Sequence, residues 1–241
     1  MAKYHSIDLP VPKVHKPLPD MMREFHAKYL EKVKTSGKPT LPPMSEQCAI
    51  AVNALLNYDM SSEANWLEKV GKQINRRFVF THCDVNRGNT LMRLADTHPD
   101  GRPMTWDERI LLIDYEFSSY GARGQDIGNH FGLQQHDFGQ KHWLMHKAFP
   151  SEARRRAFIK AYADECKRMN VFENWNENGS DSVDNIMLES EFGNLCARMK
   201  LLSFAQYAFD TFGIMHISRK EVDPEFTDQV IFFSLNVIIH R

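Results

Sequence analysis

The sequence of 241 residues lacks several features that mark whole classes of protein. Its four cysteines, at positions 48, 83, 166 and 196, lie far apart and form no CxxC pair, which argues against a zinc site or a disulfide framework and fits a reducing cytosol. No apolar run reaches the length of a membrane span, and the first residues lack the apolar core of a signal peptide. We therefore expect a cytoplasmic protein without a membrane span.

An excess of charge of one sign is also missing. Lys and Arg number 30 and Asp and Glu number 31, so the formal net charge is −1. This balance argues against a strongly basic nucleic-acid binder and against an acidic tail protein as descriptions of the whole chain. The hydrophobic and charged fractions, 42% and 25%, are those of an ordinary globular protein, and the length leaves one large domain or two small ones open.

Helical periodicity covers most of the chain. Apolar residues recur every three to four positions in several windows, and such stripes are far more often core than cofactor contacts. We predict helices over Asp20–Val33, after caps at Ser45, Ser62 and Ser151, after Asp126, over Val183–Phe212, and from Asp223 onward. The prolines between residues 8 and 20 predict an extended segment there.

Three short apolar runs interrupt this helical pattern. We predict strands over Phe78–Thr81, Thr90–Leu94 and Ile110–Ile113, with a loop over Thr97–Arg109. A few short strands in a helical chain favour an α+β, mostly α fold with a small sheet that supports a site.

The most informative segment, His82–Asn89, follows the first predicted strand and has the form H-x-D-x-x-x-x-N. In phosphoryl transfer a carboxylate accepts or orients the proton of the attacking hydroxyl, and an amide oxygen nearby helps to hold Mg²⁺. Asp84 and Asn89 meet both needs. The alternative is a chance polar loop, because His, Asp and Asn are common in loops.

The third predicted strand ends at Asp114, and Glu116 follows two residues later. A hard oxygen ligand for Mg²⁺ belongs at such a strand end in kinases. In an extended chain the two carboxylates point to the same side. For Glu116 a solvated surface acid is an equally good interpretation.

The run HCDVNRGN…LLIDYEFSSYGARGQDIGNHF resembles the choline/ethanolamine kinase family, which shares a kinase-like fold with aminoglycoside phosphotransferases. The strong match covers about Phe80–Phe138, with a weaker, mostly helical match over the rest. The D-I-G-N-H-F tail is typical of choline and ethanolamine kinases. The resemblance implies the C-terminal lobe of that fold over residues 1–241.

The resemblance also implies roles at the matching positions. Asp84 would be the catalytic base, Asn89 and Asp114 would bind Mg²⁺, and Glu116 would lie near a second metal ion. Among the supporting residues His82, Arg123 and Asp126, the last would be the buried acid that anchors the catalytic loop. A helix N-cap remains the alternative for Asp126, and for Arg123 both a pair with a carboxylate of the same cluster and plain exposure stay open.

Two departures from the family pattern concern the loop and the acceptor pocket. Cys83 stands where the family has Asn, and Leu133 stands where an acid of the cationic pocket is expected. The pocket of the family combines an acid with aromatic rings that attract a cation. The candidate pocket residues are Phe138, Tyr207, Asp210 and Phe226, and a solvated helix position is the stronger interpretation of Asp210.

The largest departure concerns the nucleotide. We find no Gly-rich hairpin and no V-A-I-K-like lysine, and we assign Gly121, Gly124 and Gly128 to the family's own turn after the metal-binding Asp. We therefore expect the small ATP-covering lobe to be absent and this chain alone to be a weak or inactive kinase, because positioning of the phosphates dominates such catalysis.

The predicted function is ATP-dependent phosphorylation of the hydroxyl of choline or ethanolamine, for phospholipid synthesis, with ATP and Mg²⁺ at the site. Two alternatives stay open: a truncated or pseudokinase member without activity, and a phosphotransferase for another small amino alcohol. The expected partners are small molecules, with a homodimer left open and no nucleic acid. His142 and His146, spaced four apart, are more readily explained as a solvated helix face than as zinc ligands.

Overall fold

The computed structural model describes residues 1–10, 13, 18–38, 46–135 and 148–217. The chain divides into two compact units. The first comprises Met1–His15, Asn75–Gly139 and His146–Asn194, and the second comprises Lys16–Ile74, Gln140–Met145 and Leu195–Arg241. Helices dominate both units and the strands are few, so the fold is α+β and mostly α, as predicted.

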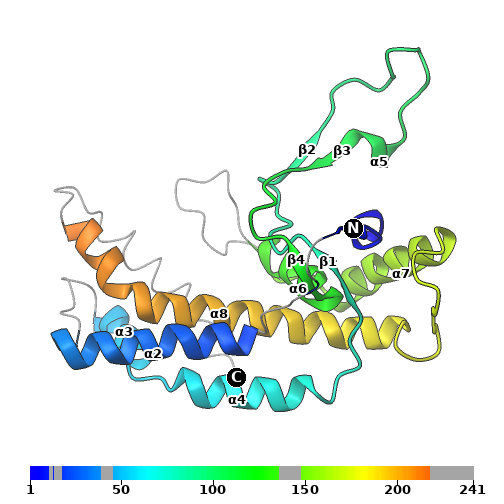
Figure 1. Cartoon of the computed structure of the whole chain (residues 1–241). Helices are drawn as coiled ribbons and strands as arrows, with labels where there is room; N and C mark the ends of the chain where they lie inside the picture. The colour runs from blue at the N-terminus through cyan, green and yellow to red at the C-terminus, as the bar shows by residue number, and fades with distance from the viewer. Residues whose placement is uncertain (11–12, 14–17, 39–45, 136–147, 218–241) are drawn as a thin grey trace. The chain divides into compact units, whose positions relative to one another are not determined.

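The strands of the first unit form two antiparallel pairs (Figure 1). The first pair joins β1 (Phe78–Thr81) to β4 (Ser119–Ala122), and the second joins β2 (Thr90–Met92) to β3 (Ile110–Leu112). β1 has its predicted bounds, whereas β2 and β3 end before theirs. β4 was not predicted, because Ser-Tyr-Gly-Ala has weak β propensity and becomes a strand through its pairing with β1.

Four helical segments accompany these strands. They are α1 (Ala2–His5), α5 (Trp106–Arg109), α6 (Arg123–Leu133) and α7 (Glu152–Arg168). α7 begins after Ser151, whose side chain accepts a hydrogen bond from Arg154 N as a cap should. α6 begins at Arg123, so Asp126 lies inside its first turn, and the interpretation of Asp126 as an N-cap is wrong. The single turn of α5 lies within the predicted loop over Thr97–Arg109.

The core of the first unit lies where α6 and α7 meet α8 (Val183–Ile217). Its buried members include Ile127, Phe131, Ile159, Tyr162 and Ile186. These side chains expose less than a tenth of their surface, as expected of apolar helix faces that pack against one another.

Two glycines allow α6 to approach α8 closely. A methyl group at Gly128 would lie 2.0 Å from the carbonyl oxygen of Ser190, and one at Gly124 would lie 2.3 Å from that of Glu189. These glycines were assigned to a turn from the sequence, and the structure places them within a helix instead. Their role is to let the backbones of α6 and α8 pack closely, which fixes the position of α6 next to the segment after β1.

A buried ionic cluster joins the start of α6 to the 174–181 loop and to α8. The Arg123 guanidinium, fully buried, donates to Asp181 at 2.6 Å and to Glu189 at 2.6 Å. Arg77, at the foot of β1, donates to Asp181 as well, at 2.5 Å. The 174–181 loop thus supplies a buried counter-ion, Asp181, which compensates the large desolvation penalty of Arg123.

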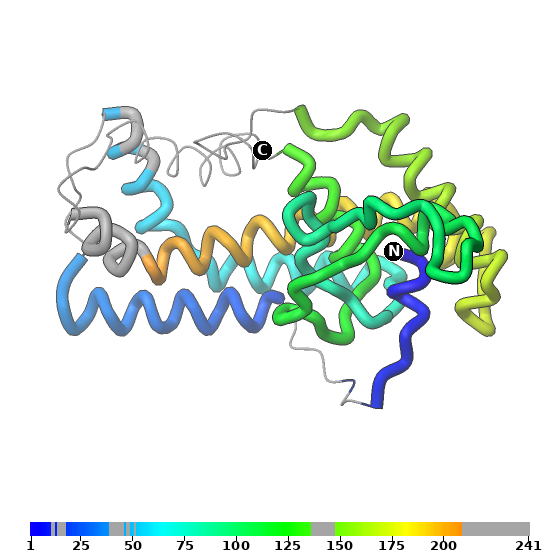
Figure 2. Tube along the Cα trace, turned by 90° about the horizontal axis from the view of Figure 1, so that it is seen from above, coloured from blue at the N-terminus to red at the C-terminus, as the bar shows by residue number. Residues whose placement is uncertain are grey.

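The second unit packs α2 (Leu18–Ser36), α3 (Glu46–Leu56) and α4 (Met60–Gly71) with the later part of α8. Figure 2 shows α2 and this part of α8 side by side, where His26 Nδ1 lies 2.8 Å from Gln206 Oε1. Gln206 also donates to the carbonyl oxygens of Leu55 and Tyr58. The predicted cap at Ser62 is wrong by three residues, because Asp59 accepts from the amides of Ser61 and Ser62.

The predicted helix from Asp223 onward, the cap at Ser45 and the pair His142 and His146 lie outside the described residues. Over the ranges described, no helix combines the length and the apolar character needed to cross a membrane.

The close approach of α6 to α8 predicts a strong difference between two glycines of one helix. Gly128→Ala should lower the free energy of unfolding by about 1–3 kcal/mol, because its methyl group meets backbone that has to move. Gly132→Ala is the control, since its methyl group meets only the Asn194 side chain, and it should be neutral or slightly stabilising. Urea unfolding curves give both values, and equal destabilisation by the two variants would contradict the packing described.

The ionic cluster predicts a loss of stability in acid. Burial raises the pKa of Asp181, but hydrogen bonds from Arg77, the Asn176 amide and Arg123 prevail and hold this pKa at about 2. A carboxyl whose pKa is lower in the folded than in the unfolded state stabilises the fold above its unfolded pKa, and this contribution disappears as the pH falls from about 4 towards 2.

We expect about 2 kcal/mol of the unfolding free energy to be lost in that pH range. Asp181→Asn should lower stability at neutral pH by about 3–5 kcal/mol, because it removes one of the two carboxylates that pair with the buried Arg123 and the carboxylate that pairs with Arg77, and should lack the loss in acid. Asp164→Asn, which removes only an exposed pair with Lys160, serves as control in the same urea titrations. An unchanged acid profile in Asp181→Asn would show that another group is responsible.

Candidate active site

The segment after β1 is anchored by one buried carboxylate. Asp126, on α6, accepts hydrogen bonds from the His82 amide at 2.9 Å and from the Cys83 amide at 2.7 Å. Its side chain is fully buried. Burial raises the pKa of Asp126, yet hydrogen bonds from His5 and from these two amides leave this pKa below its ordinary value. The carboxylate is therefore ionised and fixes the backbone where the loop leaves the strand.

The His82 ring connects this loop to the end of β3. Its Nε2 lies 3.0 Å from the carbonyl oxygen of Ile113, and the Asp84 amide donates to its Nδ1 at 3.3 Å. A carbonyl oxygen only accepts, so Nε2 carries the proton and Nδ1 is free to accept. One buried ring thus fixes Asp84 on one side and the residue before Asp114 on the other.

The Asp84 carboxylate is oriented by two amide groups of its own loop. Asn86 Nδ2 donates to Asp84 Oδ1 at 2.9 Å, and Asn89 Nδ2 donates to Asp84 Oδ2 at 2.7 Å. Asn86 Oδ1 in turn accepts from the backbone amides of Gly88 and Asn89. Each oxygen of Asp84 therefore has a donor, and the carboxylate is held in one orientation while remaining partly accessible.

Asn89 and Asp114 come together through the backbone. The Ile113 amide donates to the carbonyl oxygen of Asn89 at 3.0 Å, directly before Asp114. Asp114 has φ 67°, in the left-handed region that Asp tolerates better than most residues. The chain is therefore not extended at Asp114, so the condition under which the carboxylates of Asp114 and Glu116 point to the same side is not met at its first residue.

The donor chemistry of this group fits a divalent cation. Asn89 Nδ2 donates to Asp84, so the other polar atom of this side chain, the amide oxygen Oδ1, remains available to a cation. Asp114 and Glu116 are exposed, and neither carboxylate has a hydrogen bond or ion pair with any residue that the structure describes. Two carboxylates and an amide oxygen are ligands of the type that Mg²⁺ accepts. The described ranges hold no cluster of three or more His, Cys, Asp or Glu side chains arranged for a metal, so such a site rests on these mixed oxygen donors.

Two residues of α6 support the far side of the loop, and sequence reasoning did not assign them a role. Asn129 Nδ2 donates to the Cys83 carbonyl at 2.8 Å, and His130 Nδ1 donates to the Val85 carbonyl at 3.1 Å. Burial lowers the pKa of His130, which favours its neutral ring. Both belong to the D-I-G-N-H-F run quoted above, and their spacing of three and four from Asp126 places all three on one helix face.

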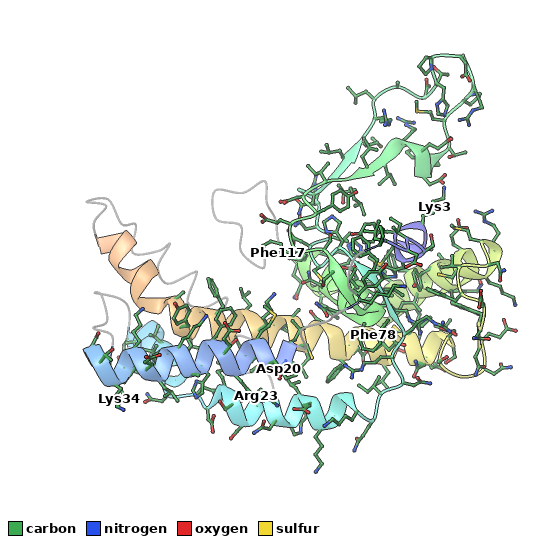
Figure 3. The ribbon with its side chains drawn as sticks, in the orientation of Figure 1. Lys3, Asp20, Arg23, Lys34, Phe78 and Phe117 are labelled. Atoms are coloured by element: carbon green, nitrogen blue, oxygen red, sulfur yellow. The ribbon has the colours of Figure 1, made fainter. Side chains whose placement is uncertain are left out.

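The short helix α1 was also missed. Its residues Tyr4 and His5 are buried, and His5 Nε2 lies 3.2 Å from Asp126 Oδ2. Figure 3 labels the neighbouring Lys3, which forms an ion pair with Asp107 of α5. A four-residue helix leaves too short a periodic signal to be predicted from sequence.

The structure corrects the interpretation of Arg123. This residue is neither exposed nor paired with Asp84, Asp114 or Glu116. It pairs with Asp181 and Glu189, which come from a loop and a helix far along the chain, and no local pattern relates them to Arg123.

Of the candidate pocket residues, the structure describes only the Tyr207 side chain. Tyr207 belongs to the second unit, where its ring stacks on Phe25 at 6.0 Å and lies within 5.9 Å and 5.6 Å of the Lys28 and Lys32 ammonium groups. The cations that this ring meets are thus the protein's own. Phe138, Phe226 and the side chain of Asp210 lie outside the described residues.

Comparison with known proteins decides the family. The model of the choline/ethanolamine kinase family matches residues 1–230. The chain belongs to the choline/ethanolamine kinase family. A mouse choline/ethanolamine kinase is 30% identical over 70% of the chain and 39% of its own length, and the human relative is 28% identical over 70% and 38%. The chain thus spans about two fifths of the length of these relatives.

A solved structure shows the same fold. Plasmodium vivax ethanolamine kinase matches 99% of this chain and 56% of its own chain, with a TM-score of 0.60 at 16% identity. The kinase-like α+β fold predicted from the sequence is therefore confirmed.

Cys83, the departure from the family's Asn, has φ 65°, again in the left-handed region. Asn adopts this conformation more readily than Cys. We expect Cys83→Asn to raise the free energy of unfolding by about 0.5–1 kcal/mol, since Thr81 and Gln125, which contact the sulfur, offer partners to the amide. Cys83→Ser, which lacks the left-handed preference, is the control in urea unfolding, and equal values for both variants would refute the backbone argument.

Proposed function

We propose that this chain carries the catalytic loop and metal-binding segment of a kinase that transfers the γ-phosphoryl group of ATP to the hydroxyl of choline or ethanolamine. The observation that supports this most directly is the convergence of Asp84, Asn89 and Asp114 around His82 and Ile113. Membership of the family supplies the acceptor class. A cytoplasmic location and the supply of phosphocholine or phosphoethanolamine to phospholipid synthesis complete the proposal.

In this proposal Asp84 orients the acceptor hydroxyl and takes its proton. Its carboxylate is already fixed by Asn86 and Asn89, so the orientation of the attacking oxygen needs little rearrangement at the moment of reaction. Each Asp84 oxygen already accepts a hydrogen bond from an amide. The substrate hydroxyl must therefore either displace one of these donors or donate a second hydrogen bond to the same oxygen.

The metal ions of the proposal are held by Asn89 Oδ1 and the Asp114 carboxylate, with Glu116 near a second ion. Bound Mg²⁺ neutralises charge on the phosphates and on the transferred group. The bend at Asp114 and the hydrogen bond from Ile113 N to Asn89 O, at the ends of the paired strands β2 and β3, support this assignment.

The chain corresponds, in this proposal, to the C-terminal lobe of the kinase-like fold over residues 1–241. It spans 39% of the length of the mouse relative. None of the four strands that the structure describes carries a lysine, whereas kinases bind the phosphates with a lysine from a strand.

That last observation favours a second candidate, a family member that lacks turnover. Isothermal calorimetry with Mg·ATP separates the two candidates at the level of binding. Heat of binding that requires Mg²⁺ and disappears in Asp114→Ala supports the enzyme, whereas no binding by the chain supports the non-catalytic member.

The acceptor is a separate question. Leu133, at the end of α6 and half-buried, stands where the resemblance calls for an acid, which favours a variant acceptor such as another small amino alcohol. A screen of choline, ethanolamine and related amino alcohols with labelled ATP ranks them by kcat/KM. A preference for choline or ethanolamine supports the proposal as stated.

Removal of the proposed base is the sharpest test of the mechanism. Asp84→Ala should lower kcat by about 10²–10⁴-fold, the usual contribution of a general base, while the far-UV spectrum and Tm stay close to those of the wild type. The control Asp96→Ala removes another exposed carboxylate of the same unit and should keep full activity. Full turnover by Asp84→Ala would refute the mechanism.

A further inference from the structure

A buried chain of side chains leads from α7 to the catalytic loop through the N-terminal helix. Tyr162, on α7, has its hydroxyl 2.9 Å from His5 Nδ1. His5 Nε2 lies 3.2 Å from Asp126 Oδ2, and Asp126 accepts from the amides of His82 and Cys83. His5 exposes 3% of its surface and Tyr162 4%, so water does not compete for these contacts.

The protonation states of Tyr162, His5 and Asp126 determine which atom donates in each of these hydrogen bonds. Burial raises the pKa of Tyr162 well above its usual value, so its hydroxyl stays protonated and donates a hydrogen bond to His5 Nδ1. Burial also lowers the pKa of His5, which favours the neutral ring with its one proton on Nε2. That N–H then donates to the ionised Asp126. His5 is thereby the third donor to a carboxylate whose other two donors are the amides of the catalytic loop.

The rest of α1 contacts the metal-binding segment. Tyr4 donates to Ser118 Oγ at 2.9 Å, and its ring stacks on that of Tyr115 with centroids 5.9 Å apart. The same ring lies 5.7 Å from the His82 ring. Tyr4 of α1 therefore contacts the segment after β3, and the next residue, His5, contacts Asp126, which anchors the loop after β1.

We propose that His5 is a positioning residue of the phosphotransfer site, which holds Asp126 in the rotamer that binds the His82 and Cys83 amides and so fixes Asp84. The consequence for catalysis rests on the proposed function, whereas the consequence for the loop does not. A carboxylate that loses one of its three donors in a buried site binds a proton more readily or rotates, and either change weakens its hold on the two amides.

The test compares three variants. His5→Phe keeps the ring volume between α6 and α7 but removes both nitrogens. His5→Gln keeps an amide donor in place of the ring N–H. His26→Phe is the matched control, since His26 is a second buried histidine, hydrogen-bonded to Gln206 in the other unit. For each, NMR hydrogen exchange follows the amides of His82 and Cys83, and steady-state kinetics follow kcat and KM.

We expect exchange of the His82 and Cys83 amides to accelerate about tenfold or more in His5→Phe relative to amides within α7, and to return close to the wild-type rate in His5→Gln. The kcat should fall by about tenfold to a hundredfold in His5→Phe with KM for ATP little changed, and recover in His5→Gln. His26→Phe should change neither.

Several outcomes would overturn the inference. One is unaltered exchange at both amides in folded His5→Phe, and another is failure of His5→Gln to restore it. Should His5→Phe not fold, the ring ¹⁵N spectrum of the wild-type chain decides, because a His5 ring protonated only on Nδ1 cannot donate to Asp126. Absence of turnover in every chain, wild type included, would count against the proposed function, and the exchange result would still judge His5.

Discussion

The site depends on one charged group that never meets a substrate, the buried carboxylate of Asp126. An ionised carboxylate in a dry interior is tolerated only when hydrogen-bond donors surround it, and here two of the three donors are backbone amides at the start of the loop after β1. Because those amides would themselves be orphaned without Asp126, the carboxylate and the loop backbone determine each other's position. The loop conformation is thus a requirement of burial rather than a preference of the loop sequence.

Two further constraints keep Asp126 where it is. The glycines of α6 bring the helix into backbone contact with α8, and the Arg123 cluster fixes the first turn of α6 to the 174–181 loop. Packing of this kind has little freedom to adjust, since side chains in a protein interior are close-packed. The left-handed conformations of Cys83 and Asp114 are stable in this setting, because the surrounding contacts outweigh the penalty of a positive φ.

The main residues of the candidate site could be proposed from the sequence, because they lie within two short segments that each follow a strand. Asp84, Asn89 and Asp114 needed only strand positions and a known chemistry. The partners of Arg123 were not readable, since Asp181 and Glu189 are 58 and 66 residues away and no periodicity relates them. The strand Ser119–Ala122 and the helix Ala2–His5 were missed for a related reason: both are too short for a local signal and form through tertiary contacts.

Two groups of carboxylates in the first unit contrast in their surroundings. Asp126, Asp181 and Glu189 are buried, and each has fixed donors whose geometry allows no exchange of partner. Asp114 and Glu116 are exposed, and no described residue pairs with them. A cation from solution would have to break existing ion pairs to reach the first group, and would lose most of its hydration in doing so. At the second group a cation would keep part of its water and break no ion pair of the described residues, which suits Mg²⁺ because it dehydrates reluctantly. Among the described residues, Asp114 and Glu116 therefore stay unpaired on the segment after β3, whose partner strand β2 begins directly after Asn89.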